Sequence, residues 1–142
     1  MKKTRLKIDY DYGFCLIGIV SIVKEYKLAW DLNQSLNINL VKQGDIAIPK
    51  TNENDLLISN LLFETENSTL RLIGNRSISE ENEEKAILLP ELQNFTHFFL
   101  IQDEAETFQR DRMIEKMKGI GSIDYVVGIE PDKLKNKDNL IF

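Results

Sequence analysis

The chain has 142 residues and a formal net charge of −5, with 42% hydrophobic and 29% charged residues. This length predicts a single globular domain over residues 1–142. The acidic balance argues against a nucleic-acid partner, because binding to phosphates requires clustered Lys and Arg. No stretch approaches the roughly 18 apolar residues of a membrane span. No apolar segment follows the basic start, so we expect no signal peptide, no membrane partner and a cytoplasmic location.

Two segments open the predicted fold. Residues 4–10 alternate apolar and polar side chains, as in a strand with one buried face. Residues 14–36 carry apolar side chains at helical spacing, and we predict one long helix or two helices with a kink near Lys24 and Glu25. Cys15, the single cysteine, lies in this apolar run and is expected to be a small buried residue. A single cysteine excludes an internal disulfide.

The rest of the chain predicts mainly strands and one further long helix. Residues 55–64 and 69–74 predict a hairpin, and the acidic stretch that follows predicts a solvated loop. Residues 95–101 are apolar on both alternating faces, which is typical of a central strand. Residues 104–118 predict a helix and residues 122–129 a last strand.

Together these elements predict an α+β fold with a mainly antiparallel sheet and helices packed on one face. The C-terminal strand–helix–strand unit of residues 95–129 is expected to form a right-handed crossover between parallel strands. The order of the elements is loosely ferredoxin-like, with additional strands.

The segment LPELQNFTH at residues 89–97 and the flanking sequence carry a family resemblance. Pro90 and Glu91 are followed, after three residues, by Phe95, Thr96 and His97. This pattern resembles the motif that names the IPExxxVDY family of uncharacterised bacterial proteins, with Thr96 and His97 where the family has Asp and Tyr. The stretches YDYGFCLIGIVSIVKEYKLAWDLNQSL, FFLIQ and KNKDNLIF also fit the family. The resemblance implies cytoplasmic proteins and no known activity, cofactor or catalytic residue.

Two polar residues of this segment are candidates for a binding site. His97 is the only histidine, and imidazoles serve as general acids, bases or ligands. On so apolar a strand, a packed imidazole satisfied by a hydrogen bond is the simpler interpretation. Glu91 follows Pro90 at a predicted helix start, where a carboxylate opposes the positive end of the helix dipole. Known nucleotide, hydrolase and metal motifs are absent, so we predict no catalytic residue, no metal and no cofactor.

Apolar residues at two places are candidates for an interface. Tyr26 and Trp30 lie four residues apart and can stack on one flank of the predicted helix. They are either core residues of a helix that is covered on two sides, or an exposed patch of the kind found at interfaces. The terminal Leu140, Ile141 and Phe142 either pack onto the sheet or insert into a partner.

Two functions from different classes follow from these residues. The first is a non-enzymatic adaptor that binds another protein or forms a homodimer, since catalytic motifs are absent and apolar features lie at Trp30 and at the terminus. The second is a small-molecule-binding protein or enzyme with a site at Glu91, His97 and Asp124. The second function requires these three side chains to converge on one cleft.

Overall fold

A six-stranded antiparallel sheet forms the centre of the protein. The computed structural model describes residues 14–50, 53–78, 86–103 and 107–140. The strand order is β2-β5-β6-β7-β1-β8, and each neighbouring pair is antiparallel. The strands are β1 (Cys15–Val20), β2 (Val41–Lys42), β5 (Asn60–Glu64), β6 (Ser68–Gly74), β7 (His97–Asp103) and β8 (Tyr125–Ile129).

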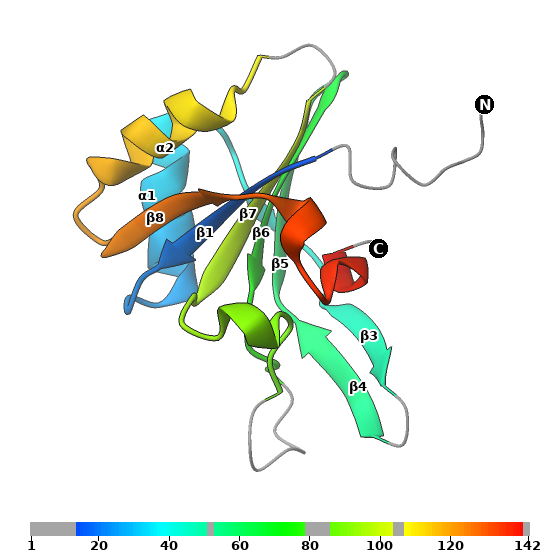
Figure 1. Ribbon diagram of the computed structural model, residues 1–142. Coiled ribbons are helices and arrows are strands. Elements are labelled where there is room, and N and C mark those ends of the chain that lie inside the picture. The colour runs from blue at the N-terminus through cyan, green and yellow to red at the C-terminus, as the bar shows by residue number, and fades with distance from the viewer. Residues whose placement is uncertain (1–13, 51–52, 79–85, 104–106, 141–142) are drawn as a thin grey trace.

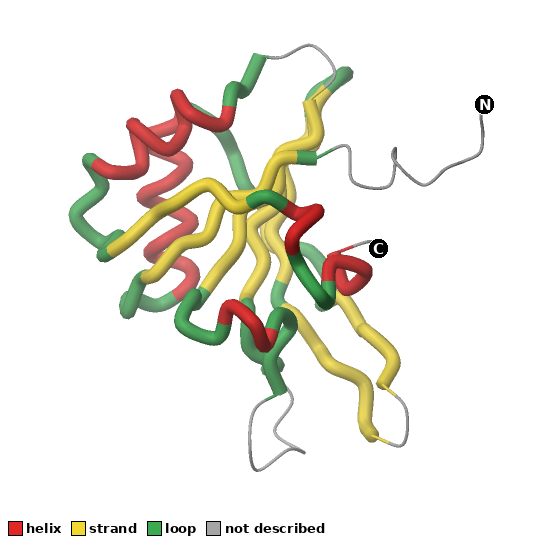
Figure 2. The backbone as a smooth tube through the Cα atoms, in the orientation of Figure 1, coloured by secondary structure: helices red, strands yellow, loops and turns green. Residues whose placement is uncertain are grey.

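The remaining elements cover the two faces of this sheet. Both α-helices lie together on one side of it, and the short 3-10 helices lie away from them (Figure 1, Figure 2). A separate antiparallel hairpin of two strands projects beyond the sheet (Figure 1). These elements are α1 (Glu25–Leu36), α2 (Arg110–Lys118), the hairpin strands β3 (Ile46–Lys50) and β4 (Glu53–Ile58), and the 3-10 helices η2 (Pro90–Leu92), η3 (Pro131–Lys133) and η4 (Lys137–Leu140).

Apolar side chains fill a layer on each face of the sheet, so the central strands are buried on both sides. The helix-side layer joins strand residues to residues of α1 and α2, among them Ile17, Ile19, Leu28, Leu32, Phe99, Ile101, Met113 and Met117. The second layer joins the other strand face to β4, to the segment before η2 and to the C-terminal turns, through Leu16, Leu56, Ile58, Leu88, Leu89, Phe98, Leu100, Leu134 and Leu140.

The structure confirms the predicted α+β class, the mainly antiparallel sheet and the placement of both helices on one face. The strand–helix–strand unit is β7-α2-β8. Both strands are antiparallel to β1, which lies between them, so they run parallel to each other without being neighbours. The four strands β6-β7-β1-β8, with α1 after β1 and α2 after β7, have the alternation of a ferredoxin-like unit. Strands β2 to β5 are an insertion between α1 and β6.

The prediction of a helix from residue 14 onward is wrong. Residues 15–20 form β1, and α1 begins only at Glu25, where the sequence had predicted a kink. Leu16 and Ile17 point to opposite faces of the sheet, and both are fully buried. A strand that is covered on both faces is continuously apolar, and its residues then satisfy helical spacing as well.

Three further expectations are corrected or fall outside the described part. Residues 55–64 form parts of two strands, because β4 ends at Ile58 and β5 begins at Asn60. Cys15 is exposed, whereas the sequence predicted a buried thiol. The strand predicted over residues 4–10 lies outside the described residues. None of the helices in the described ranges is long and apolar enough to cross a membrane.

Gly18 is a position where the sheet leaves no room for a side chain. A Cβ atom there would lie 2.7 Å from the ring of Phe95 and 2.7 Å from Cδ1 of Ile129. We therefore expect Gly18→Ala to lower the free energy of unfolding by about 1–2 kcal/mol through overpacking. Urea denaturation measures this change. Gly44→Ala is the control, since nothing lies within 4 Å of its added Cβ, and an equal loss in both variants would contradict the overpacking.

Candidate functional site

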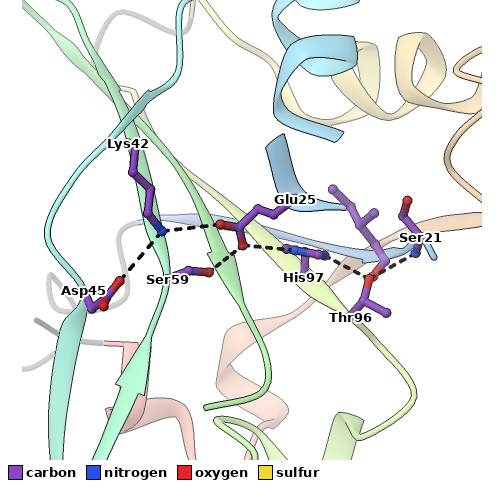
Figure 3. Close-up of polar contacts among 8 residues, drawn as sticks. Ser21, Glu25, Lys42, Asp45, Ser59, Thr96 and His97 are labelled. Carbon is purple, nitrogen blue, oxygen red and sulfur yellow. Dashed lines mark hydrogen bonds and ion pairs between the residues drawn. The ribbon is translucent and has the colours of Figure 1, made fainter. Parts of the chain in front are cut away.

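A polar cluster fixes the first turn of α1 to the sheet. Oε2 of Glu25 accepts a hydrogen bond from the hydroxyl of Ser59 and lies 3.2 Å from Nε2 of His97 in β7 (Figure 3). Its Oε1 lies 3.5 Å from Nζ of Lys42 in β2. Burial alone would raise the pKa of Glu25, but the hydrogen bonds from His97 and Ser59 and the charge of Lys42 outweigh it and lower that pKa. The carboxylate thus binds two strands to one helix.

His97 is engaged at both ring nitrogens. Its Nδ1 lies 3.0 Å from the hydroxyl oxygen of Thr96, which lies 3.1 Å from the carbonyl oxygen of Ile19 and accepts from the N–H of Ser21 (Figure 3). The succession of hydroxyl, imidazole and carboxylate resembles the connectivity of a hydrolase triad. A nucleophile, however, must reach substrate, and here the hydroxyl contacts backbone on both sides while His97 is only 9% exposed. The arrangement joins α1 to β7.

Glu91 binds a different segment of the molecule, and Asp124 lies beside the end of β1. Glu91 accepts hydrogen bonds at 2.8 Å and 2.9 Å from the backbone N–H and the side-chain amide of Asn136. Burial alone would raise the pKa of Glu91, but these bonds outweigh it and lower that pKa. Asp124 is exposed, and its backbone N–H donates to the carbonyl oxygen of Val20. The structure therefore does not bring Glu91 and His97 together, and Glu91 instead holds the segment between η3 and η4.

Tyr26 and Trp30 lie on the outer side of α1, opposite the residues that face the sheet. Tyr26 is 74% and Trp30 57% exposed, and Ile22, just before the helix, is 88% exposed. Nζ of Lys27 lies 5.1 Å from the centroid of the Trp30 ring, within the range of a cation–π interaction. We call Tyr26 and Trp30 the α1 face. Of the two interpretations of Tyr26 and Trp30, exposure is therefore the one observed.

A shallow depression of about 390 Å³ lies beside this face. It is lined by Lys27, Asp31, Gln34 and Ser35 of α1 and by residues 119–122 between α2 and β8, and we call it the α1 hollow. Asp31 joins its two walls, because it accepts a hydrogen bond from the Ser122 hydroxyl at 2.6 Å and from Lys27 at 3.0 Å. The same two bonds, that from Ser122 first, lower the pKa of Asp31.

The C-terminal candidates divide between the core and the undescribed part. Leu140 is buried in the second layer, and the side-chain amide of the preceding Asn139 donates to the carbonyl oxygen of Leu88 at 2.9 Å. Ile141 and Phe142 lie outside the described residues. Leu140 thus packs onto the domain.

Sequence reasoning missed three features of this region. Ile22 was assigned to a helix, so its exposure after the end of β1 could not be seen. The lining of the hollow includes two glycines, Gly119 and Gly121, which no local sequence pattern connects to α1. Glu25 was considered only as the position of a kink, and its partner His97 is too distant in sequence to be found from spacing.

Among the described residues, no three His, Cys, Asp or Glu side chains gather closely enough to hold a metal ion. No protein family, curated protein or solved structure matches this chain in sequence or structure comparison. The geometry of α1 and its surroundings therefore provides the basis for a functional assignment.

Proposed function

We propose that this protein is a non-enzymatic interaction module of the cytoplasm that binds another protein chain through the α1 face. The observation that carries the proposal is the exposure of two large aromatic side chains, Tyr26 and Trp30, on one helix. Tyrosine and tryptophan are enriched in interfaces and dominate their energetics. The resemblance to the IPExxxVDY family remains a prediction beside this proposal and supplies no activity.

The α1 face is supported by contacts at both ends of the helix and at its middle. Glu25 binds the first turn to Ser59 and His97, and Asp31 binds the middle to Ser122. At the end of the helix, Oδ1 of Asn33 accepts from the N–H of Leu40 at 2.8 Å. A helix that is held in this way loses little conformational entropy when a partner binds.

A small-molecule or enzymatic site near Glu91 and His97 has less support. The carboxylate of Glu91 is bound to Asn136, and both ring nitrogens of His97 contact protein groups. These polar groups are therefore already bound within the protein.

Replacing Trp30 by alanine should weaken the complex by about 2 kcal/mol, or about 30-fold in Kd, because a central tryptophan is a typical hot spot. A photo-crosslinking amino acid placed at position 26 and expressed in the native cell should capture the partner, which mass spectrometry identifies. The Kd of the purified pair is then measured by calorimetry for the wild-type protein and for Trp30→Ala.

Val41 provides the matched control, since it is also an exposed apolar residue but lies on the edge strand β2 and not on α1. A crosslinker at position 41 should capture nothing, and Val41→Ala should leave the Kd unchanged. Equal crosslinking from positions 26 and 41, or a Kd that does not respond to Trp30→Ala, would contradict the assignment of the α1 face.

A further inference from the structure

The α1 face and the α1 hollow are neighbouring parts of one surface, and their shapes are opposite. Trp30 projects from the helix, whereas Lys27 and Asp31, which precede and follow it in the sequence, line the hollow. The hollow has a volume of about 390 Å³ and is open to the outside, with Gly121 in its lining. A Cβ atom added to Gly121 would meet nothing within 4 Å, so there is room there for a foreign side chain.

The charges of this surface permit contact with a second copy of the chain. The whole chain has a net charge of −5, so two copies repel each other at most orientations. At the hollow, however, Lys27 and Asp31 form an ion pair of zero net charge. The third charged residue of α1, Glu25, is bound to Ser59, His97 and Lys42. An antiparallel pairing of two α1 helices brings Lys27 of each copy toward Asp31 of the other, which is attractive.

A two-fold interface requires a patch that complements itself, so that a projection and its recess lie on the same surface. We infer that the partner of the α1 face is a second copy of this chain, with Trp30 of each copy seated in the α1 hollow of the other. This inference rests on the proposed interaction function and names its partner. Tyr26 and Trp30 together expose on the order of 300 Å² per copy, which forms the apolar centre of an interface whose rim is polar.

Two variants remove the two halves of the contact separately. Trp30→Ala removes the projection and leaves the hollow intact. Gly121→Gln fills the hollow and leaves Trp30 intact, and the added side chain is polar, so it creates no new apolar surface. Gly44→Gln is the matched control, because Gly44 also has nothing within 4 Å of an added Cβ but lies between β2 and β3. Circular dichroism verifies that each variant is folded.

Sedimentation equilibrium over a concentration series measures the association. The wild-type protein and Gly44→Gln should reach twice the 16.5 kDa mass of the chain. Each single variant loses both symmetric contacts, so its dimer dissociation constant should rise about 1,000-fold, at about 30-fold for each contact. A mixture of Trp30→Ala with Gly121→Gln restores one contact, since the intact Trp30 of one chain meets the open hollow of the other. The mixed dimer should therefore be tighter than either variant alone.

Other results would overturn the inference. They are a wild-type protein that stays monomeric at every concentration, a dimer that neither variant weakens, or a mixture that associates no better than its components. These results leave the interaction function itself intact if position 26 still crosslinks to a different protein and the affinity of that pair depends on Trp30. If position 26 crosslinks to neither the same chain nor another, both the function and the inference fail.

Discussion

Replacing Asn75 by alanine should lower the free energy of unfolding by at least about 3 kcal/mol, because three backbone groups lose their partner at once. Asn75 is fully buried. Its amide nitrogen donates to the carbonyl oxygens of Leu92 at 3.0 Å and Phe95 at 2.9 Å, and its Oδ1 accepts from the N–H of Leu89 at 3.0 Å. This one side chain therefore fixes the segment that connects β6 to β7.

Urea denaturation measures the change, and hydrogen exchange localises it, since the Leu89 amide should lose its protection. Asn75→Asp keeps the acceptor for Leu89 but loses both donors and introduces a charge into a fully buried position. It should destabilise at least as much as alanine at neutral pH. Asn94→Ala is the control, because Asn94 is exposed in the same segment and its replacement should change stability by no more than about 0.5 kcal/mol. A similar small effect at Asn75 would contradict the role described.

Replacing Glu25 by alanine should cost about 3 kcal/mol, since the substitution leaves the ring nitrogen of His97 and the hydroxyl of Ser59 without their common acceptor. Equilibrium denaturation at neutral pH gives this value. Glu25→Gln should cost less, because the amide retains one acceptor and adds donors. If Glu25→Ala and Glu25→Gln both leave the free energy of unfolding almost unchanged, the cluster does not hold α1 to the sheet.

The same cluster should make stability depend on pH. The pKa of Glu25 lies below its ordinary value of 4.5 in the folded protein. A lowered pKa contributes stability that is fully present above the unfolded value and is lost as the pH falls through the folded one. The difference in unfolding free energy between the wild-type protein and Glu25→Gln should thus shrink as the pH falls below about 4.5.

Taking this difference removes the contributions of Asp31 and Glu91, whose pKa values are also lowered. A difference that stays constant down to about pH 3, or that grows as the pH falls, would contradict the assignment of the lowered pKa to Glu25.

The sequence predicted the fold class from its second half. In β6, β7 and β8 the spacing of apolar residues agrees with the structure to within a few residues at each boundary. The first third was misread, because a strand buried on both faces has the same apolar content as a buried helix. Gly18 and its β-branched neighbours are poor helix formers, and tertiary pairing with β7 and β8 decided the outcome.

The candidate site was predictable only in part. Tyr26 and Trp30 were found because a spacing of four residues places them on one side of a helix. The other half of the surface, at residues 119–122, reaches α1 only through the tertiary fold. For Glu91, the sequence predicted a role at a helix start, but its partner Asn136 lies on a segment whose position no local pattern reveals.

The position of β1 has a consequence for how the protein is made. This strand is the first in the described chain, yet both of its partners come late, since Ile17 pairs with Phe99 and with Gly128. During synthesis β1 leaves the ribosome with two unpaired edges and an uncharged sequence, and these edges can pair only after β7 and β8 have emerged. Such a high contact order slows folding and prolongs exposure to aggregation. The insertion of β2 to β5 lengthens that delay. We therefore expect this protein to be most prone to aggregation while it is being synthesised.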